Sequence, residues 1–162
     1  MNPGASPRRR ATAFAALAVM LPLLAGCSLL EGPTPDTPPR ETVAVPEVAP
    51  EFVPGGTAEQ NLPYFTEVLR TYSTGTSPIQ GAQVVQAVTE AGFDPALMQV
   101  SFDQTKTSLP ADNIFVSVRA GAECLIGQLV TEDRSFVAAV EPALGPDKTI
   151  CLIGKTAPIA GQ

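Results

Sequence analysis

The residues of this chain that are best able to carry chemistry are its three cysteines, Cys27, Cys124 and Cys151. A thiolate can be acylated, bind a metal or act as a nucleophile, and two thiols can form a disulfide. The chain has no histidine, so the commonest general base and metal ligand is absent. Serine–histidine and cysteine–histidine catalysis are therefore excluded within one chain. We expect no catalytic residues, no metal and no cofactor.

Two of the cysteines head the same tetrapeptide, CLIG, at residues 124–127 and 151–154. An internal duplication would explain the repeat, but the flanking residues show no wider similarity. A redox or metal-binding pair would also explain it, although neither the C-x-x-C spacing nor a histidine partner is present. The third explanation is a disulfide between Cys124 and Cys151, which an exported chain can form in an oxidising compartment. We favour the disulfide, with the two CLIG segments as similar strands lying side by side.

Carboxylates are the remaining chemical candidates. Two carboxylates that converge across a cleft can hydrolyse a glycosidic bond. In this chain the pair would be Asp103 and Glu123, acting on an envelope polymer. Neither residue belongs to a recognisable catalytic motif, so we expect no enzymatic activity and keep the hydrolase as an alternative.

Charge excludes one class of partner. The chain has 10 basic and 16 acidic residues, and three of the basic ones form the run Arg8-Arg9-Arg10. The rest of the chain then has 7 basic residues against the 16 acidic ones. Binding to nucleic acid depends on lysines and arginines that neutralise phosphates, so we expect no nucleic-acid partner. An acidic surface favours basic or neutral partners.

The arginine run opens an N-terminal signal. An uncharged apolar stretch, ATAFAALAVMLPLL, follows it, which is typical of secretory signal peptides. The stretch is shorter than the ~20 residues that a membrane-spanning helix needs. The next residues are Leu24-Ala25-Gly26-Cys27, and they resemble the lipobox at which bacterial lipoprotein precursors are cleaved.

This resemblance implies that residues 1–26 are a lipoprotein signal peptide and that Cys27 carries a diacylglyceryl group on its sulfur. Two or more acyl chains anchor a protein stably, whereas one chain binds only marginally. We therefore expect a lipid-anchored protein on the extracytoplasmic face of the cell membrane, with membrane lipid as the partner of Cys27. The alternative is an ordinary signal peptide followed by a coincidental cysteine.

Residues 27–56 are expected to be a proline-rich linker. Proline fixes φ and lacks an N–H, so a segment this rich in proline forms neither a helix nor a central strand. An extended spacer of this length reaches at most ~90 Å from the membrane. The prolines lie at positions 33, 35, 38, 39, 46, 50 and 54.

Residues 57–162 are expected to form one small α+β domain. Leu62, Phe65, Leu69 and Tyr72 follow a helical spacing, and Pro63 places the helix start near residue 62. A second helix is predicted over residues 77–91, with Ser77 as N-cap, Pro78 at the first helical position and Gly92 as the stop; its core-facing residues are Ile79, Val85 and Val88.

Strands are predicted in the remainder of the domain. Alternating apolar residues indicate strands over residues 98–102 and 114–118, and apolar runs indicate two more over 124–130 and 149–154. The segment 135–141 is compatible with either a strand or a helix. The predicted fold is therefore two helices on one face of an antiparallel sheet of about five strands.

Several short motifs of this domain are similar to those of a known family. They are NLPYF (61–65), AGF (91–93), MQV (98–100), CLIGQ (124–128) and the second CLIG. Together they resemble a small domain of unknown function found in actinobacterial lipoproteins, over nearly all of residues 57–155. The resemblance implies an exported, lipid-anchored domain and provides no catalytic residues.

We expect a non-enzymatic binding module whose partner is an envelope protein or ligand. An apolar groove beside the sheet would support this reading, and a carboxylate cleft would support the hydrolase. A domain with neither would be a purely structural envelope component. The surface expected to bind is the face of the sheet without helices, where the polar candidates are Gln99, Ser101, Ser117 and Arg119.

Overall fold

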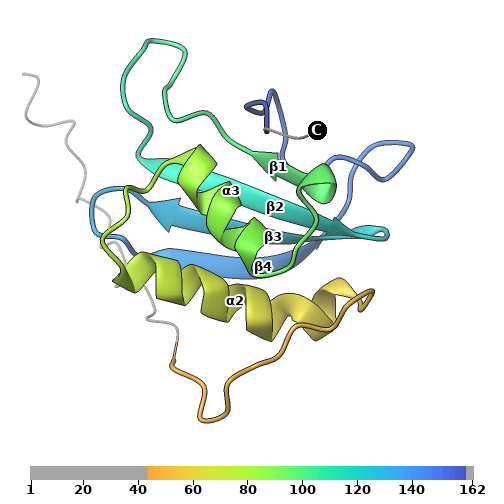
Figure 1. The fold of residues 1–162 in the computed structure, drawn as a ribbon. Coiled ribbons are helices and arrows are strands. Elements are labelled where there is room, and N and C mark those ends of the chain that lie inside the picture. Colours follow the sequence, from red (N-terminus) through yellow and green to blue (C-terminus); the bar gives the residue numbers. More distant parts are fainter. Residues whose placement is uncertain (1–43, 160–162) are drawn as a thin grey trace, which may run out of the picture. The chain divides into compact units, whose positions relative to one another are not determined.

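The structure of the chain is a computed structural model that describes residues 44–159. The predictions for the signal peptide, for Cys27 and for the first part of the linker lie outside the described residues. The described elements follow the order α2, α3, a short 3-10 helix (η2), and β1 to β4. Figure 1 shows α2 and α3 on the same side of the sheet.

Helix α2 spans Ala58–Thr74, so the predicted start near residue 62 is wrong by four residues. A capping box at its N-terminus explains the difference: the Gln60 N–H donates to the Thr57 hydroxyl, and the Thr57 N–H donates to the Gln60 side chain. Pro63 therefore lies inside the helix. Because Pro63 has no N–H, the carbonyl of Glu59 loses a helical partner close to the N-terminus, where the cost is smallest.

Helix α3 spans Gly81–Glu90 and begins later than predicted. Ser77 is not its N-cap, since Gln80 occupies that position and makes no side-chain cap bond. The carboxylate of Asp103 caps the helix instead, with its Oδ1 accepting from the Gly81 N–H at 2.6 Å. The predicted stop is confirmed: Gly92 follows the helix with φ +102°, a conformation that favours glycine.

The four strands form one antiparallel sheet in the order β1-β2-β3-β4. The segment 135–141, for which the sequence allowed either a strand or a helix, is a strand: it corresponds to β4 (Phe136–Pro142). η2 spans Pro95–Leu97 and leads directly into β1. The strands are β1 (Met98–Val100), β2 (Asn113–Ala120), β3 (Glu123–Val130) and β4 (Phe136–Pro142).

The predicted fifth strand over residues 149–154 is wrong. The only β-bridge of this segment among the described residues pairs Ile150 with Leu144, and residues 151–154 form bends. The fold class is confirmed, because two helices pack on an antiparallel sheet and a disulfide joins Cys124 to Cys151. The sheet has four strands among the described residues.

The core lies between the helices and the sheet. Phe65 and Leu69 of α2 are fully buried, as are Val84 and Val88 of α3. At Gly127 of β3 the close approach requires glycine, because an added Cβ would lie 2.4 Å from Leu69 Cδ1 and 3.3 Å from the Phe65 ring. The first CLIG segment therefore ends in glycine so that α2 can pack directly on the strand.

The chain contacts the domain before α2 begins. The Phe52 ring packs against Tyr64 and Phe93, with centroid separations of 5.6 Å and 4.9 Å. The buried side chain of Asn61 bonds both backbone groups of Val53, accepting at 2.9 Å and donating at 3.0 Å. The end of the proline-rich segment is thus part of the folded domain.

Candidate functional site

The disulfide between Cys124 and Cys151 is confirmed. The two Cα atoms lie 5.7 Å apart, and both cysteines are buried beside Ala143 and Ile126. The prediction that the two CLIG segments are strands lying side by side is wrong, because only the first CLIG belongs to the sheet. Register places the Cys124 and Ile126 side chains on the face away from the helices, so the bridge holds residues 151–154 across that face.

Gln99 is the second attachment of this segment to the sheet. Its Oε1 accepts from the backbone N–H groups of Cys151 and Leu152, both at 2.9 Å. Its Nε2 donates to the carbonyl of Thr149 at 3.3 Å. One side chain of β1 therefore satisfies three backbone groups of a segment that has almost no ladder bonds of its own.

These contacts correct the predicted binding surface. Ser117 is fully buried, and its hydroxyl donates to the Gln99 carbonyl at 3.5 Å, so it is not part of an exposed surface. The side-chain amide of Gln99 is already hydrogen-bonded to the backbone of Thr149, Cys151 and Leu152. Ser101 is partly exposed and accepts from the Phe115 N–H at 2.9 Å, and Arg119 is partly exposed at the far end of β2. The four polar residues share a face as expected, but the C-terminal segment covers part of it.

A small apolar groove remains beside that segment. It has a volume of about 330 Å³, with Ser101, Phe115 and Ile126 of the sheet on one side and Ile153 and Lys155 on the other. Ile153 is 87% exposed, so the groove opens directly to the surface.

A larger groove, of about 530 Å³, lies between α3 and the end of the described chain. The tail is fixed at this point because the Ala157 N–H donates to the Val100 carbonyl at 2.8 Å, along the outer edge of β1. We call this hollow the α3 groove. Most of its lining is apolar, and two carboxylates, Glu90 and Asp103, stand at its margin; the lining includes Ala82, Val85, Val100, Ala157, Pro158 and Ile159.

The carboxylates proposed for hydrolysis are not brought together. The backbone of Asp103 pairs with Ala111, just before β2, whereas Glu123 lies opposite Ala120 at the other end of that strand. The length of β2 separates them, roughly 26 Å for its 8 residues at about 3.3 Å per residue, which is well beyond the spacing of a catalytic pair. Among residues 44–159 no cluster of three metal-ligating side chains occurs.

Residues 69–155 match the domain of unknown function DUF6993. This match spans more than half of the chain. The chain belongs to this family. No curated protein and no solved structure matches it. Both grooves and the disulfide lie largely or wholly within the matched DUF6993 region.

Arg134 organises the end of the DUF6993 domain opposite the disulfide, a role that the sequence did not indicate. From the turn between β3 and β4, its guanidinium donates to the carbonyls of Tyr72, Ser73 and Ser77 at 2.9, 2.8 and 3.0 Å. A cation at the C-terminus of α2 also complements the helix dipole. Burial raises the pKa of Tyr72, whose hydroxyl donates to the Pro78 carbonyl.

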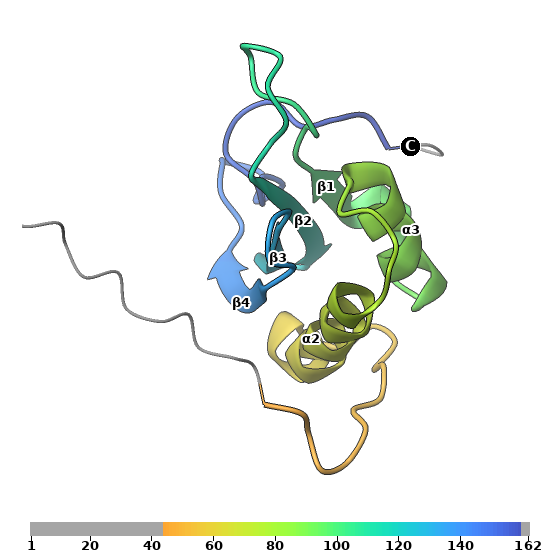
Figure 2. The same ribbon diagram turned by 90° about the vertical axis from the view of Figure 1, so that its left-hand side faces the viewer.

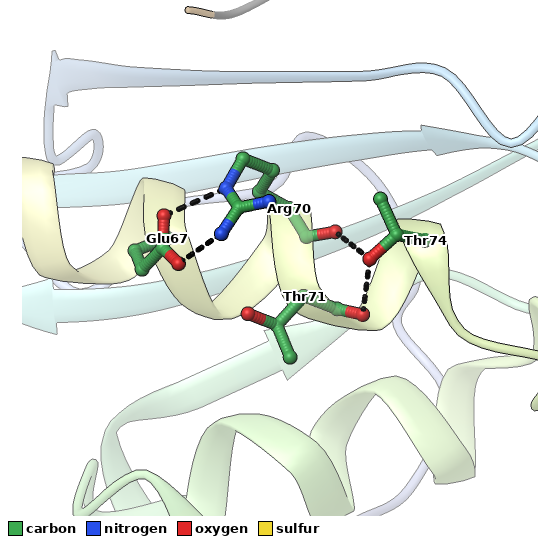
Figure 3. Close-up of polar contacts among 4 residues, drawn as sticks. All are labelled: Glu67, Arg70, Thr71 and Thr74. Atoms are coloured by element: carbon green, nitrogen blue, oxygen red, sulfur yellow. Dashed lines mark hydrogen bonds and ion pairs between the residues drawn. The ribbon is translucent and has the colours of Figure 1, made fainter. Parts of the chain in front are cut away.

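The outer face of α2 carries the ion pair of Glu67 and Arg70, shown in Figure 3. The hydrogen bond from Arg70 lowers the pKa of Glu67. Thr74 closes the same helix by donating to the carbonyls of Arg70 and Thr71, both at 3.1 Å. The ion pair and the Thr74 hydrogen bonds all join residues of one helix, so they stabilise α2 locally. Within the described part of the DUF6993 chain, no helix combines the length and the hydrophobicity needed to cross a membrane.

Proposed function

We propose that this protein is a lipid-anchored extracytoplasmic lipoprotein whose DUF6993 domain is a non-enzymatic binding module. The disulfide supports the location, because such bridges persist in oxidising compartments and are consistent with an extracellular domain. The lipobox-like residues 24–27 support the anchor.

The observation that carries the binding role is the α3 groove. A mostly apolar hollow with a few polar groups at its margin is the usual form of a ligand site. Its volume of about 530 Å³ is in the range that small ligands or short peptide segments fill. Val85 and Val100 line the α3 groove and both belong to the buried core. An apolar group that entered the groove would therefore contact the edge of the core.

The margin of the groove limits the chemistry of the ligand. Glu90 and Asp103 are both acidic, and one oxygen of Asp103 is already bound to the Gly81 N–H. Among residues 44–159, no lysine or arginine lines the groove. A ligand that is apolar with a neutral or positively charged end fits these groups, and an anionic ligand does not.

The proposal is tested by filling the α3 groove with a large side chain and measuring whether the protein still binds its partner. Ala82 is exposed on α3 and lines the groove, so Ala82→Trp places a large ring in it. Ala122, exposed in the turn between β2 and β3, provides the matched control Ala122→Trp. Crosslinking in intact cells, followed by purification of the full-length protein, should capture a defined partner with wild type and the control but not with Ala82→Trp.

Two results would favour the other functions. Equal capture by all three proteins would show that the α3 groove is not the binding site. Capture of nothing by any of them would favour a purely structural envelope component. The hydrolase alternative receives no support from the positions of Asp103 and Glu123, and turnover of an envelope polymer by the purified protein would overturn the non-enzymatic role.

A further inference from the structure

Two exposed loops of the domain share an unusual composition. We call residues 101–112 and 143–156 the lysine loops. Among the described residues, every exposed hydrophobic side chain larger than valine lies in them, with Ile153 at 87% and Leu109 at 62% exposure. The five side chains are Phe102, Leu109, Leu144, Ile150 and Ile153. The other exposed large hydrophobics are four valines elsewhere.

The same loops hold all the lysines of the chain. These are Lys106, Lys148 and Lys155, and all three are exposed. Each is two or three residues from an exposed apolar side chain: Lys106 from Leu109, Lys148 from Ile150, and Lys155 from Ile153. Apolar side chains and flexible cations are therefore displayed together.

Charge is divided unevenly between these loops and the rest of the domain. The loops contain three lysines and three aspartates, so their net charge is zero. The other residues from 44 to 159 contain three arginines and ten aspartates or glutamates, a net charge of −7. Of the loop aspartates, Asp103 is turned towards the N-terminus of α3, where it binds the Gly81 N–H. The domain thus has an acidic body and neutral loops in which every cation is a lysine.

Both loops are held in place by backbone hydrogen bonds. In the first, the Thr105 N–H donates to the Leu109 carbonyl at 2.8 Å, and in the second, Leu144 and Ile150 exchange two backbone bonds at 2.7 and 3.1 Å. The disulfide fixes Cys151 as well. Figures 1 and 2 show the teal and blue loops on the side of the sheet away from α2, the teal loop at one end of the strands and the blue loop at the other.

We propose that the lysine loops dock the domain on an anionic lipid surface. The apolar tips would enter the headgroup region while Lys106, Lys148 and Lys155 bind lipid phosphates. Repulsion between the lipid and the acidic body would orient the loops towards the membrane. Exposed apolar patches mark either protein or membrane contacts. Here the lysines favour the membrane, since protein interfaces are depleted in lysine.

This inference rests on the proposed function for one condition, that the mature domain is close to a membrane. The two can nevertheless be tested apart. Acyl labelling at Cys27 tests the anchor, whereas contact of the loops with lipid is measured on full-length chain placed in vesicles directly. If Cys27 proves not to be acylated, the contact of the loops with lipid can still be measured.

The first experiment maps lipid contact by position. A photoreactive diazirine amino acid replaces Ile153 or Leu109 in the full-length chain, and it replaces Thr71, exposed on α2, as the control. The proteins are reconstituted in vesicles of phosphatidylglycerol and phosphatidylcholine, illuminated, and analysed for lipid adducts by mass spectrometry. Adducts at Ile153 and Leu109 should exceed those at Thr71 severalfold. Equal yields at all three positions, or adducts to protein in place of lipid, would overturn the proposal.

The second experiment separates the position of the lysines from total charge. One variant replaces Lys106, Lys148 and Lys155 with Gln, and the matched variant introduces Glu at Thr71, Ala96 and Ala122, all exposed and outside the loops. Both make the chain more acidic by the same amount. With the diazirine at Leu109, lipid adducts should fall about fivefold for each lysine replaced and change little in the matched variant.

Equal losses in the two variants would show that total charge alone is responsible, and would overturn the assignment to the loops. Melting temperatures of both variants check that they fold. Wild-type chain in vesicles of phosphatidylcholine alone gives a further readout that needs no substitution. There, adducts at Leu109 should drop to the yield at Thr71, and unchanged adducts would contradict the role of anionic lipid.

Discussion

The side chain of Gln99 binds the backbone of Cys151, with its Oε1 accepting from the Cys151 N–H at 2.9 Å. The same oxygen accepts from Leu152, so a single amide on β1 positions the cysteine that forms the disulfide with Cys124. The disulfide and the Gln99 side chain thus hold the same residues, Cys151 and its neighbour Leu152. Together they explain how a segment without regular structure is held across part of the sheet face.

Replacing Gln99 should loosen this segment. Gln99→Ala leaves the N–H groups of Cys151 and Leu152 without their acceptor, which should lower the free energy of unfolding by about 1–3 kcal/mol. Gln86→Ala on the exposed face of α3 is the control and should change stability by less than about 0.5 kcal/mol. Chemical denaturation measures both, and hydrogen exchange at residues 151 and 152 should accelerate only in the Gln99 variant. Unchanged exchange there would contradict this role.

The disulfide should make a larger contribution than the amide. Cys124 and Cys151 are separated by 27 residues, for which the loop-entropy relation gives about 3.5 kcal/mol. Reduction, or the double substitution of both cysteines with Ser, should therefore lower the melting temperature of the purified protein. Alkylation followed by intact-mass measurement should find no free thiol at either position in unreduced protein. Two reactive thiols there would contradict the bridge.

Arg134 should stabilise the domain far more than Arg70. Arg134→Ala removes three hydrogen bonds to the carbonyls at the end of α2 and should cost about 1–3 kcal/mol. Arg134→Lys keeps the charge but not the planar fork, so it should restore only part of that loss. Arg70→Ala breaks an exposed pair with Glu67 and should cost less than about 1 kcal/mol. Equal losses for the two alanine variants would contradict the capping role of Arg134.

The sequence predicted those parts of the fold that depend on local patterns. The spacing of Phe65 and Leu69 and the alternation around Val116 each depend on neighbours in the chain, and both are confirmed. The start of α2 was misplaced because Pro63 was given more weight than the capping box of Thr57 and Gln60. The capping box is itself a local pattern, since Thr57 and Gln60 lie three residues apart.

The parts that the sequence did not predict depend on contacts between distant residues. Gln99 lies 52 residues from Cys151, and Arg134 lies 62 residues from Tyr72. No local pattern distinguishes these side chains from others on a surface. The second CLIG has the composition of a strand, but the disulfide and Gln99 hold it across the sheet, where no neighbouring strand can pair with it. Tertiary contacts overrode its β propensity.

The anchor proposed at Cys27 has a direct test. Cys27→Ala should abolish incorporation of labelled fatty acid and block cleavage before that residue, because the thiol is the proposed acylation site. Cys124→Ser with Cys151→Ser is the control, since neither cysteine follows a lipobox-like motif, and it should remain acylated. Labelling that persists in Cys27→Ala would contradict the proposed anchor.

The contact of Gly127 with Leu69 should be the least tolerant of added volume. In Gly127→Ala the new methyl group would meet Leu69 Cδ1 at 2.4 Å, so α2 or its side chain must shift, at a cost of about 1–3 kcal/mol. Leu69→Ala alone leaves a cavity and should cost about 2–5 kcal/mol. In the double variant the added methyl group lies where the leucine was removed, and its loss of stability should be smaller than the sum of the two single losses. Additive losses, measured by chemical denaturation of all three variants, would show that α2 does not press on β3 at this glycine.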